Sequence, residues 1–361
     1  MLFNLLTSLI DQYSFLNVFK YLTFRTGLSV ITSLIVVFLI GGPLIKIFSE
    51  KMITGPIRQD GPIDHIIKKS GTPTMGGIII IIGIISSTLL WADLSNIYVW
   101  TLIFVSLSLG GLGLLDDVLK IKLKNSRGLK SKYKFFGQFI ISALALFILI
   151  KFSNHNYLYD LYFPFFKNLV WHMGLFFIPF ALFVIIGSSN AVNLTDGLDG
   201  LATVPVMLVA LSYTLISYVV GNTIFSEYLQ IQYIPDVGEL SIFCGAIVGS
   251  CLGFLWYNAP PAKIFMGDTG SLSLGGSLAA IAIIVKHEIV LAIIGGLFVL
   301  ETASVIIQVV SFKLTGKRIF KMAPIHHHFE KKGWAESTIV IRFWIIAIIL
   351  ALVGLATLKL R

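Results

Sequence analysis

Stretches of about 20 apolar residues recur along the whole chain, and they restrict its fold more than any other feature. A helix of that length crosses the hydrocarbon core of a bilayer, so each stretch is a candidate membrane span. The chain is 56% hydrophobic and only 12% charged, whereas soluble domains carry about 25% charged residues. The sequence therefore predicts a membrane protein.

The apolar stretches predict ten transmembrane helices, at residues 24–47, 75–91, 99–115, 135–150, 171–188, 201–220, 240–256, 271–285, 289–312 and 340–358. No internal repeat or soluble domain interrupts them, so we expect an all-α polytopic fold in a single domain, residues 1–361. Residues 1–20 lack a basic first segment and a small-residue cleavage site, which indicates an uncleaved interfacial segment. Cys244 and Cys251 are interpreted as small buried residues.

Basic residues gather in alternate connections between the predicted spans. The third connection holds seven of them between Lys120 and Lys134, whereas the sixth holds Glu227, Asp236 and Glu239 without lysine or arginine. Because basic loops stay in the cytoplasm, both termini are predicted on the periplasmic side of a bacterial inner membrane. In so apolar a chain the net charge of +9 reflects this topology, and nucleic acid is not an expected partner.

Polar clusters fall in the predicted cytoplasmic connections. Asp116 and Asp117 are adjacent acids at the end of the third span. Two acids that ionise beside a low dielectric need a cation or basic partners, and hard oxygen donors suit Mg²⁺. The alternative is a solvated helix end next to the basic loop.

A second cluster follows the fifth span. Asn190 and Asn193 are three residues apart and share a helix face. Asp196-Gly197-Leu198-Asp199-Gly200 then permits a tight turn with exposed backbone amides. Such a turn suits a phosphate, a sugar or a base, and the alternative is an ordinary polar turn.

A third cluster lies between the seventh and eighth spans. Asp268 occupies a glycine-flanked turn before a helix, where a metal ligand or an ordinary helix cap would lie. Asn258 precedes it, and Phe265 could stack on a base or anchor at the interface. Before the second span, Lys69 and Thr74 flank a flexible glycine-containing segment that suits phosphate or pyrophosphate.

His326, His327 and His328 are consecutive. Adjacent residues on a helix diverge, which argues against a three-histidine zinc site and favours one or two histidines that bind phosphate oxygens. An interfacial polar turn is the alternative. Glu301 is an acid deep in the ninth span and indicates either a functional residue or a partner within the bundle. Gln308 lies seven residues later on the same face.

All of these clusters are predicted on the same side of the membrane. This shared location is stronger evidence for a functional site than any single motif. Acids for a hard cation, lysines and histidines for anionic oxygens, and Asn/Gly turns fit phosphoryl-group transfer. A site at the membrane boundary would let a lipid phosphate arrive laterally while a nucleotide arrives from the cytoplasm. The sequence therefore predicts a catalytic site on the cytoplasmic face.

The chain resembles the polyprenyl-phosphate N-acetylhexosamine 1-phosphate transferases over essentially its whole length. The likeness rests on Gly-Thr-Pro-Thr-Met-Gly-Gly from Gly71, the Asp116-Asp117 pair, residues 190–200, Phe-Met-Gly-Asp-Thr-Gly-Ser from Phe265, and Ala-Pro-Ile-His-His-His-Phe-Glu from Ala323. The resemblance implies a ten-helix Mg²⁺-dependent enzyme with UDP-N-acetylmuramoyl-pentapeptide and undecaprenyl phosphate as substrates. Its products would be lipid I and UMP.

The resemblance also implies roles for the motif residues. Asp268 would bind Mg²⁺, while Asp116 and Asp117 would handle the lipid phosphate. The reacting phosphates would be lined by Lys69, Asn193, Asp196, His326 and His327. Uridine would be held by Gly197, Leu198, Asp199 and Phe265. Further substrate contacts are expected from Thr74, Asn190, Asn258, Gln308 and His328.

Several alternatives stay open at this stage. Asp116 could orient a direct attack by the lipid phosphate, or an aspartate could form a covalent phospho-enzyme. A related enzyme could use UDP-N-acetylglucosamine as donor. A secondary transporter is disfavoured, because its site would lie near the bilayer midplane. The sequence leaves the oligomeric state open, with a homodimer among the outcomes.

Overall fold

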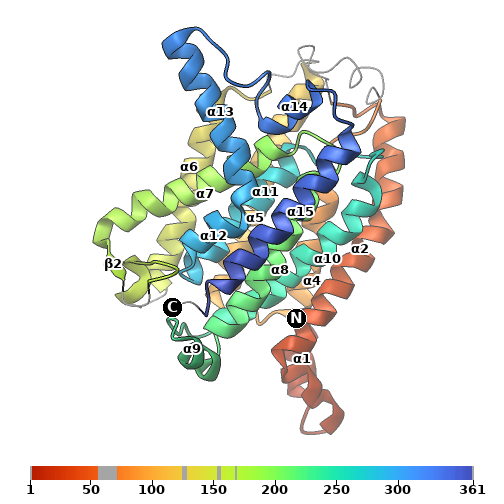
Figure 1. Cartoon of the computed structure of the whole chain (residues 1–361). Coiled ribbons are helices and arrows are strands. Elements are labelled where there is room, and N and C mark those ends of the chain that lie inside the picture. Colours follow the sequence, from red (N-terminus) through yellow and green to blue (C-terminus); the bar gives the residue numbers. More distant parts are fainter. Residues whose placement is uncertain (1, 56–70, 124–127, 153–155, 167–168, 360–361) are drawn as a thin grey trace.

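The computed structural model of the chain describes residues 2–55, 71–123, 128–152, 156–166 and 169–359. This part of the chain forms a bundle of long helices with a single two-stranded hairpin, as Figure 1 shows. Nine of its helices have the length and hydropathy of a membrane span, and a further apolar helix has 15 residues. The predicted all-α polytopic fold is confirmed.

The ten apolar helices follow the ten predicted spans. They are α2 (Leu22–Glu50), α4 (Gly77–Trp91), α5 (Ile97–Lys122), α6 (Ser131–Phe152), α7 (Phe177–Thr195), α8 (Thr203–Val220), α10 (Leu240–Asn258), α11 (Gly267–Ile284), α13 (Gly296–Thr315) and α15 (Glu336–Ala356). The short elements are α1 (Leu2–Ser8), η1 (Ser14–Lys20), η2 (Asn156–Tyr159), β1 (Asp160–Tyr162), β2 (Val170–His172), η3 (Gly174–Phe176), α9 (Thr223–Leu229), η4 (Val237–Glu239), α12 (Glu288–Ile294) and α14 (Ile325–Glu330).

Two predicted spans differ in detail from the structure. The span expected from residue 171 begins at Phe177, because Trp171 pairs with Leu161 in the antiparallel hairpin β1–β2. The span expected at residues 289–312 is divided at Gly295 into α12 and α13. Apolar composition does not distinguish a short strand or a helix break from a continuous helix.

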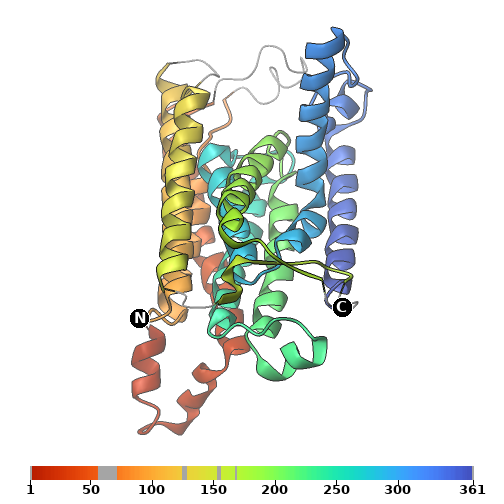
Figure 2. The same ribbon diagram turned by 90° about the vertical axis from the view of Figure 1, so that its left-hand side faces the viewer.

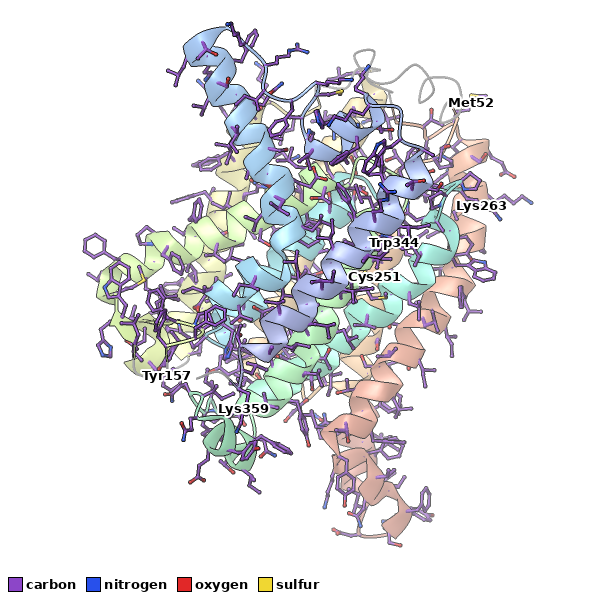
Figure 3. The ribbon with its side chains drawn as sticks, viewed as in Figure 1. Met52, Tyr157, Cys251, Lys263, Trp344 and Lys359 are labelled. Atoms are coloured by element: carbon purple, nitrogen blue, oxygen red, sulfur yellow. The ribbon has the colours of Figure 1, made fainter. Side chains whose placement is uncertain are left out.

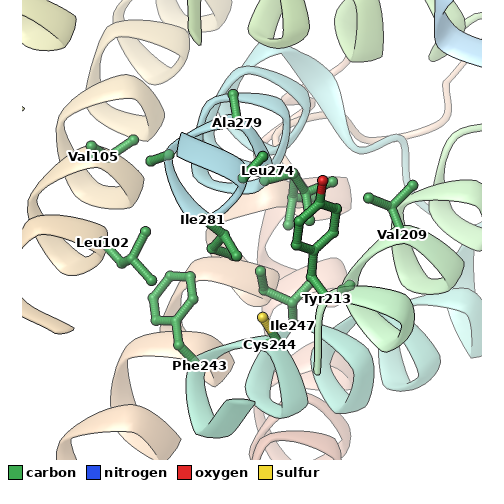
Figure 4. Packing of buried hydrophobic residues seen from close by; sticks show 14 of the residues in the cluster. Leu102, Val105, Val209, Tyr213, Phe243, Cys244, Ile247, Leu274, Ala279 and Ile281 are labelled. Carbon is green, nitrogen blue, oxygen red and sulfur yellow. The ribbon is translucent and has the colours of Figure 1, made fainter. Parts of the chain in front are cut away.

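Helix α11 is the centre of the bundle, and 94% of its apolar window is buried. Its sequence is rich in Gly, Ala and Ser, which lets α5 and α7 approach closely on either side. Figure 4 shows the core around it, with Leu102 of α5, Tyr213 of α8, Phe243 of α10 and Leu274 of α11 converging. The same core encloses Cys244, and both cysteines are free and buried, as predicted.

The two ends of the bundle differ in character. Figures 1 and 2 place both chain termini toward one end, where the hairpin, α9 and α1 also lie. Figure 3 shows Tyr157 and Lys359 toward that end and Met52 and Lys263 toward the opposite one. We call the end with α14, Met52 and Lys263 the site end, because the polar clusters described next gather there.

Candidate active site

Three buried carboxylates form the centre of the site. Asp116 and Asp117 lie on α5, and Asp268 lies in the first turn of α11. One oxygen from each carboxylate falls within 4.8 Å of the others. The sequence placed the acids at the end of the third span, but α5 continues to Lys122, so both point into the bundle and are 2–3% exposed.

Two lysines neutralise most of this negative charge. The Lys120 ammonium lies 2.7 Å from Asp116 and 3.0 Å from Asp268, and Lys134 at the start of α6 also contacts Asp268. Three acids and two lysines leave one net negative charge when all are ionised. Neither lysine was singled out from the sequence, although Lys120 follows Asp116 by four residues, the spacing of an ion pair on a helix.

Asp117 positions α11. Its carboxylate accepts hydrogen bonds from the backbone amides of Asp268 and Thr269 and from the Thr269 hydroxyl at 2.8 Å. An acid that binds free amides at a helix start stabilises that helix end. Gly113 allows this contact, because a Cβ there would lie 2.2 Å from the carbonyl oxygen of Asp268. Asp117 therefore joins α5 to α11 and fixes where Asp268 lies.

A cavity of about 260 Å³ opens beside the carboxylates. Ten of the residues predicted for the site line it, namely Thr74, Asp117, Asn193, Asp196, Gly197, Leu198, Asp199, Asn258, Phe265 and Asp268. Asn193 donates hydrogen bonds to Asp268 and to the Ser271 hydroxyl, at 2.9 and 2.8 Å. The motifs from four separate connections thus meet in one place, as the sequence predicted.

The turn at residues 196–200 forms one wall of this cavity. Asn258 braces the turn, because its side-chain oxygen accepts hydrogen bonds from the Gly200 amide and the Thr203 hydroxyl. Asp199 accepts a hydrogen bond from the Ala262 amide, and its own amide donates to Glu336 of α15. Glu336 was not predicted, since nothing in its local sequence marks it as a partner of a turn 137 residues away.

The surroundings of Asp196 in this turn shift its pKa. Burial, followed by the negative charges of Asp268 and Asp117, raises the pKa of Asp196 from its ordinary value of 3.8 to about 7. The carboxyl therefore changes charge near neutral pH, at the wall of the cavity.

The three histidines of α14 point in different directions, as their spacing predicted. His326 is fully buried, with Nδ1 3.0 Å from the Glu301 carboxylate. His327 contacts Glu330, and the Nδ1 atom of His328 accepts a hydrogen bond from the Lys321 amide. Glu301 thus has a partner within the bundle, which was one of its two predicted roles.

His326 connects this buried pair to the cavity. A Cβ at Gly197 would lie 2.3 Å from the His326 Nε2 atom, so the imidazole packs directly behind the turn that lines the cavity. Nε2 itself has no hydrogen-bond partner among the described residues. Only a glycine at position 197 lets the ring come so close, and this contact couples α13 and α14 to the turn.

Some predicted site residues lie away from this cavity. Asn190 bonds to Gln138 and lines an apolar groove of about 680 Å³ between α6 and α7. Gln308 binds the backbone of Ile319 and Phe320. Lys69 lies outside the described residues. The groove reaches Lys134, which also contacts the carboxylate centre.

The fold and the site together define a polytopic membrane protein with a buried centre of acids and lysines between a polar cavity and an apolar groove. The family model for glycosyl transferase family 4 matches residues 99–286, and phospho-N-acetylmuramoyl-pentapeptide-transferase signature 1 matches residues 69–81. The phospho-N-acetylmuramoyl-pentapeptide-transferase of Pelagibacter ubique (strain HTCC1062) is 68% identical over 361 residues, all of both chains. The chain belongs to glycosyl transferase family 4 and, within it, to the phospho-N-acetylmuramoyl-pentapeptide-transferases.

Proposed function

We propose that the chain transfers phospho-N-acetylmuramoyl-pentapeptide from UDP-N-acetylmuramoyl-pentapeptide to undecaprenyl phosphate, giving lipid I and UMP. Family membership supports the reaction. One observation links this reaction to particular residues: the carboxylate centre lies between the polar cavity and the apolar groove. The cavity suits a nucleotide diphosphate, and the apolar groove that ends at Lys134 suits a polyprenyl chain with a terminal phosphate.

The carboxylates fit a magnesium ion. Mg²⁺ prefers hard oxygen ligands, and Asp116, Asp117 and Asp268 offer three of them within 4.8 Å of one another. We propose Asp268 as a ligand, with the other two acids beside it. When bound, the ion would neutralise charge on the diphosphate. Asn193 orients Asp268 through its side-chain amide, and Asp117 does so through the backbone.

The proposed reaction is a direct displacement. An oxygen of undecaprenyl phosphate forms a bond to the β-phosphorus of the donor, the bond from that phosphorus to the bridging oxygen breaks, and UMP leaves with the electron pair. Asp116 orients the acceptor phosphate, and Lys120 and Lys134 offset its charge. Such a transfer depends mainly on positioning and electrostatics, which this arrangement supplies.

The turn at residues 196–200 and Phe265 would hold the uridine. Phe265 lines the same cavity as Gly197 and Leu198, so we propose that the base stacks on its ring. The amides of Gly197, Asp199 and Gly200 donate hydrogen bonds within the protein, so they shape the turn and leave recognition of the nucleoside to side chains and carbonyl groups. His326 supports this turn from behind. The reacting end of the molecule is proposed to face the cytoplasm, where the nucleotide is available.

One assay tests the donor. The purified chain in detergent, with Mg²⁺ and undecaprenyl phosphate, is offered UDP-N-acetylmuramoyl-pentapeptide or UDP-N-acetylglucosamine, and UMP is measured. We expect UMP only with the first donor. Turnover with the second alone would reject the proposed donor, and UMP release that does not require undecaprenyl phosphate would reject the acceptor.

A second assay tests the direct route. The chain is incubated with donor carrying a labelled β-phosphate and with Mg²⁺ while the lipid acceptor is withheld. Direct displacement predicts that no label becomes attached to protein. Label that survives denaturation and chases into lipid on addition of acceptor would establish a covalent phospho-enzyme instead.

A further inference from the structure

A second polar space at the site end is separate from the cavity. It has a volume of about 760 Å³ and is lined by Val305, Gln308, Val309, Phe312, Lys313, Arg318, Lys321, Met322, Ala323 and Lys331. It shares no lining residue with the cavity beside the carboxylates. We call it the basic groove, after Lys313, Arg318, Lys321 and Lys331.

The basic groove has a defined shape because the loop after α13 is tied down. Gln308 accepts hydrogen bonds from the amides of Ile319 and Phe320, at 3.0 and 2.9 Å, and donates one to the Phe320 carbonyl. His328 accepts a hydrogen bond from the Lys321 amide. These contacts hold the loop against α13 and α14, and they give Gln308 and His328 a role apart from the carboxylate centre.

The four cations of the basic groove have no acidic partner within the described residues. No carboxylate there comes within ion-pair distance of Lys313, Arg318, Lys321 or Lys331. The Lys321 ammonium instead donates a hydrogen bond to the Lys331 carbonyl, at 3.2 Å. Four positive charges that line one groove, without a counter-charge among the described residues, favour an anionic ligand.

The other wall of the basic groove is apolar and continues onto an exposed helix face. Val309 and Phe312 line the groove and are 45% and 54% exposed, and Ile306, Val310 and Leu314 on the same end of α13 are also exposed. α13 has the length and hydropathy of a membrane span, so this exposed face meets lipid. A soluble anion would gain no binding energy from this apolar wall, whereas an acyl chain would.

We propose that the basic groove binds an anionic phospholipid of the adjacent leaflet, with the headgroup phosphate among the four cations and an acyl chain along α13. Basic clusters next to a membrane helix attract anionic headgroups, and each cation near the surface adds to the affinity. The bound lipid would hold the loop and α14, which carries His326, against the bundle.

The proposal is tested by measuring lipid binding to the full chain in detergent. Neither donor, acceptor nor turnover is needed, so the result does not depend on the proposed reaction. Native mass spectrometry would follow titration with dioleoylphosphatidylglycerol or dioleoylphosphatidylcholine. We expect tighter binding of phosphatidylglycerol. The triple variant Lys313→Gln, Arg318→Gln, Lys321→Gln should lose affinity for it by about tenfold or more.

The matched control removes the same charge elsewhere at the site end, with Lys122→Gln, Lys130→Gln and Lys132→Gln, and should bind like the parent chain. Equal losses in both triple variants, or no preference for phosphatidylglycerol, would overturn the proposal. So would displacement of the lipid by excess inorganic phosphate, which would indicate a site for free anions. A triple variant with intact lipid binding but a raised KM for the donor would assign the cations to the donor instead.

The cations are exposed, so their replacement should leave the fold intact, and a thermal melt of each variant checks this. If the triple variant melts early, Arg318→Gln alone replaces it. A single substitution with unchanged phosphatidylglycerol affinity would then count against the proposal.

Discussion

Asp268 is the residue on which the proposed chemistry depends most. It contacts Lys120, Lys134 and Asn193, and its carboxylate lies within 4.8 Å of those of two further acids. Asp268→Asn should lower kcat by about 10²–10³-fold, the usual cost of removing one electrostatic contact to a transition state. Glu50→Gln, an exposed acid at the same end, is the control and should keep full activity. Equal losses in the two variants would remove Asp268 from the reaction.

Glu301 and His326 form a buried pair that we regard as positioning residues for the turn at Gly197. Glu301→Ala leaves the imidazole without its partner, and we expect KM for the donor to rise by about tenfold or more, which corresponds to about 1.4 kcal/mol. Glu301→Gln keeps the shape and an acceptor, so it should restore most of the affinity. Steady-state kinetics on both variants separate KM from kcat. A fall in melting temperature with unchanged KM in the alanine variant would indicate a purely structural pair.

The raised pKa of Asp196, about 7 in the folded chain, predicts a dependence of stability on pH. A carboxyl that holds its proton more tightly when folded stabilises the fold at low pH, and this stabilisation is lost as pH rises from about 4 to about 7. Asp196→Asn cannot ionise. In buffer without divalent cations, the melting temperature of the parent chain should therefore fall more between pH 5 and pH 8 than that of the variant. Parallel pH curves would contradict the assignment.

At the scale of helices, the position of Asp268 depends on the close approach of the α5 and α11 backbones. Gly113 of α5 and Gly111, two residues away, form a matched pair, because a Cβ at Gly113 meets Asp268 and Thr269 whereas one at Gly111 meets nothing within 4 Å. Gly113→Ala should destabilise the fold by about 1–3 kcal/mol and reduce activity, since α5 and α11 must separate. Gly111→Ala should be neutral or slightly stabilising. Thermal melts and UMP release measure both, and similar behaviour of the two variants would refute the packing argument.

The elements themselves were largely predictable. Every expected span has its helix, because a span needs a long apolar run and little else in the sequence produces one. The end of α5 was placed too early, since Asp116 and Asp117 were read as a boundary although the helix continues to Lys122. The hairpin that contains Trp171 and the break at Gly295 were also missed, because their local composition is as apolar as that of a helix.

At the scale of the whole molecule, the prediction concerns orientation. The native cysteines are buried, so single introduced cysteines can report the accessible side. Met52→Cys at the site end and Tyr228→Cys at the opposite end both replace exposed side chains, at 81% and 67%. In intact spheroplasts a membrane-impermeant maleimide should label Tyr228→Cys and spare Met52→Cys until the membrane is opened. The reverse pattern would place the site end outside.

The sequence alone was enough for the class of fold, the places of the apolar helices and the set of motifs, because each of these depends on residues close together in the chain. A long apolar stretch is enough to predict a helix, whereas the side of the membrane inferred from lysine and arginine remains a prediction. Tertiary structure decided which motif residues meet. It separated Asn190, Gln308 and His328 from the carboxylate centre and added Lys120, Lys134 and Glu336 to the site. Such contacts join helices that are distant in sequence, so they depend on how the helices pack, which no local pattern records.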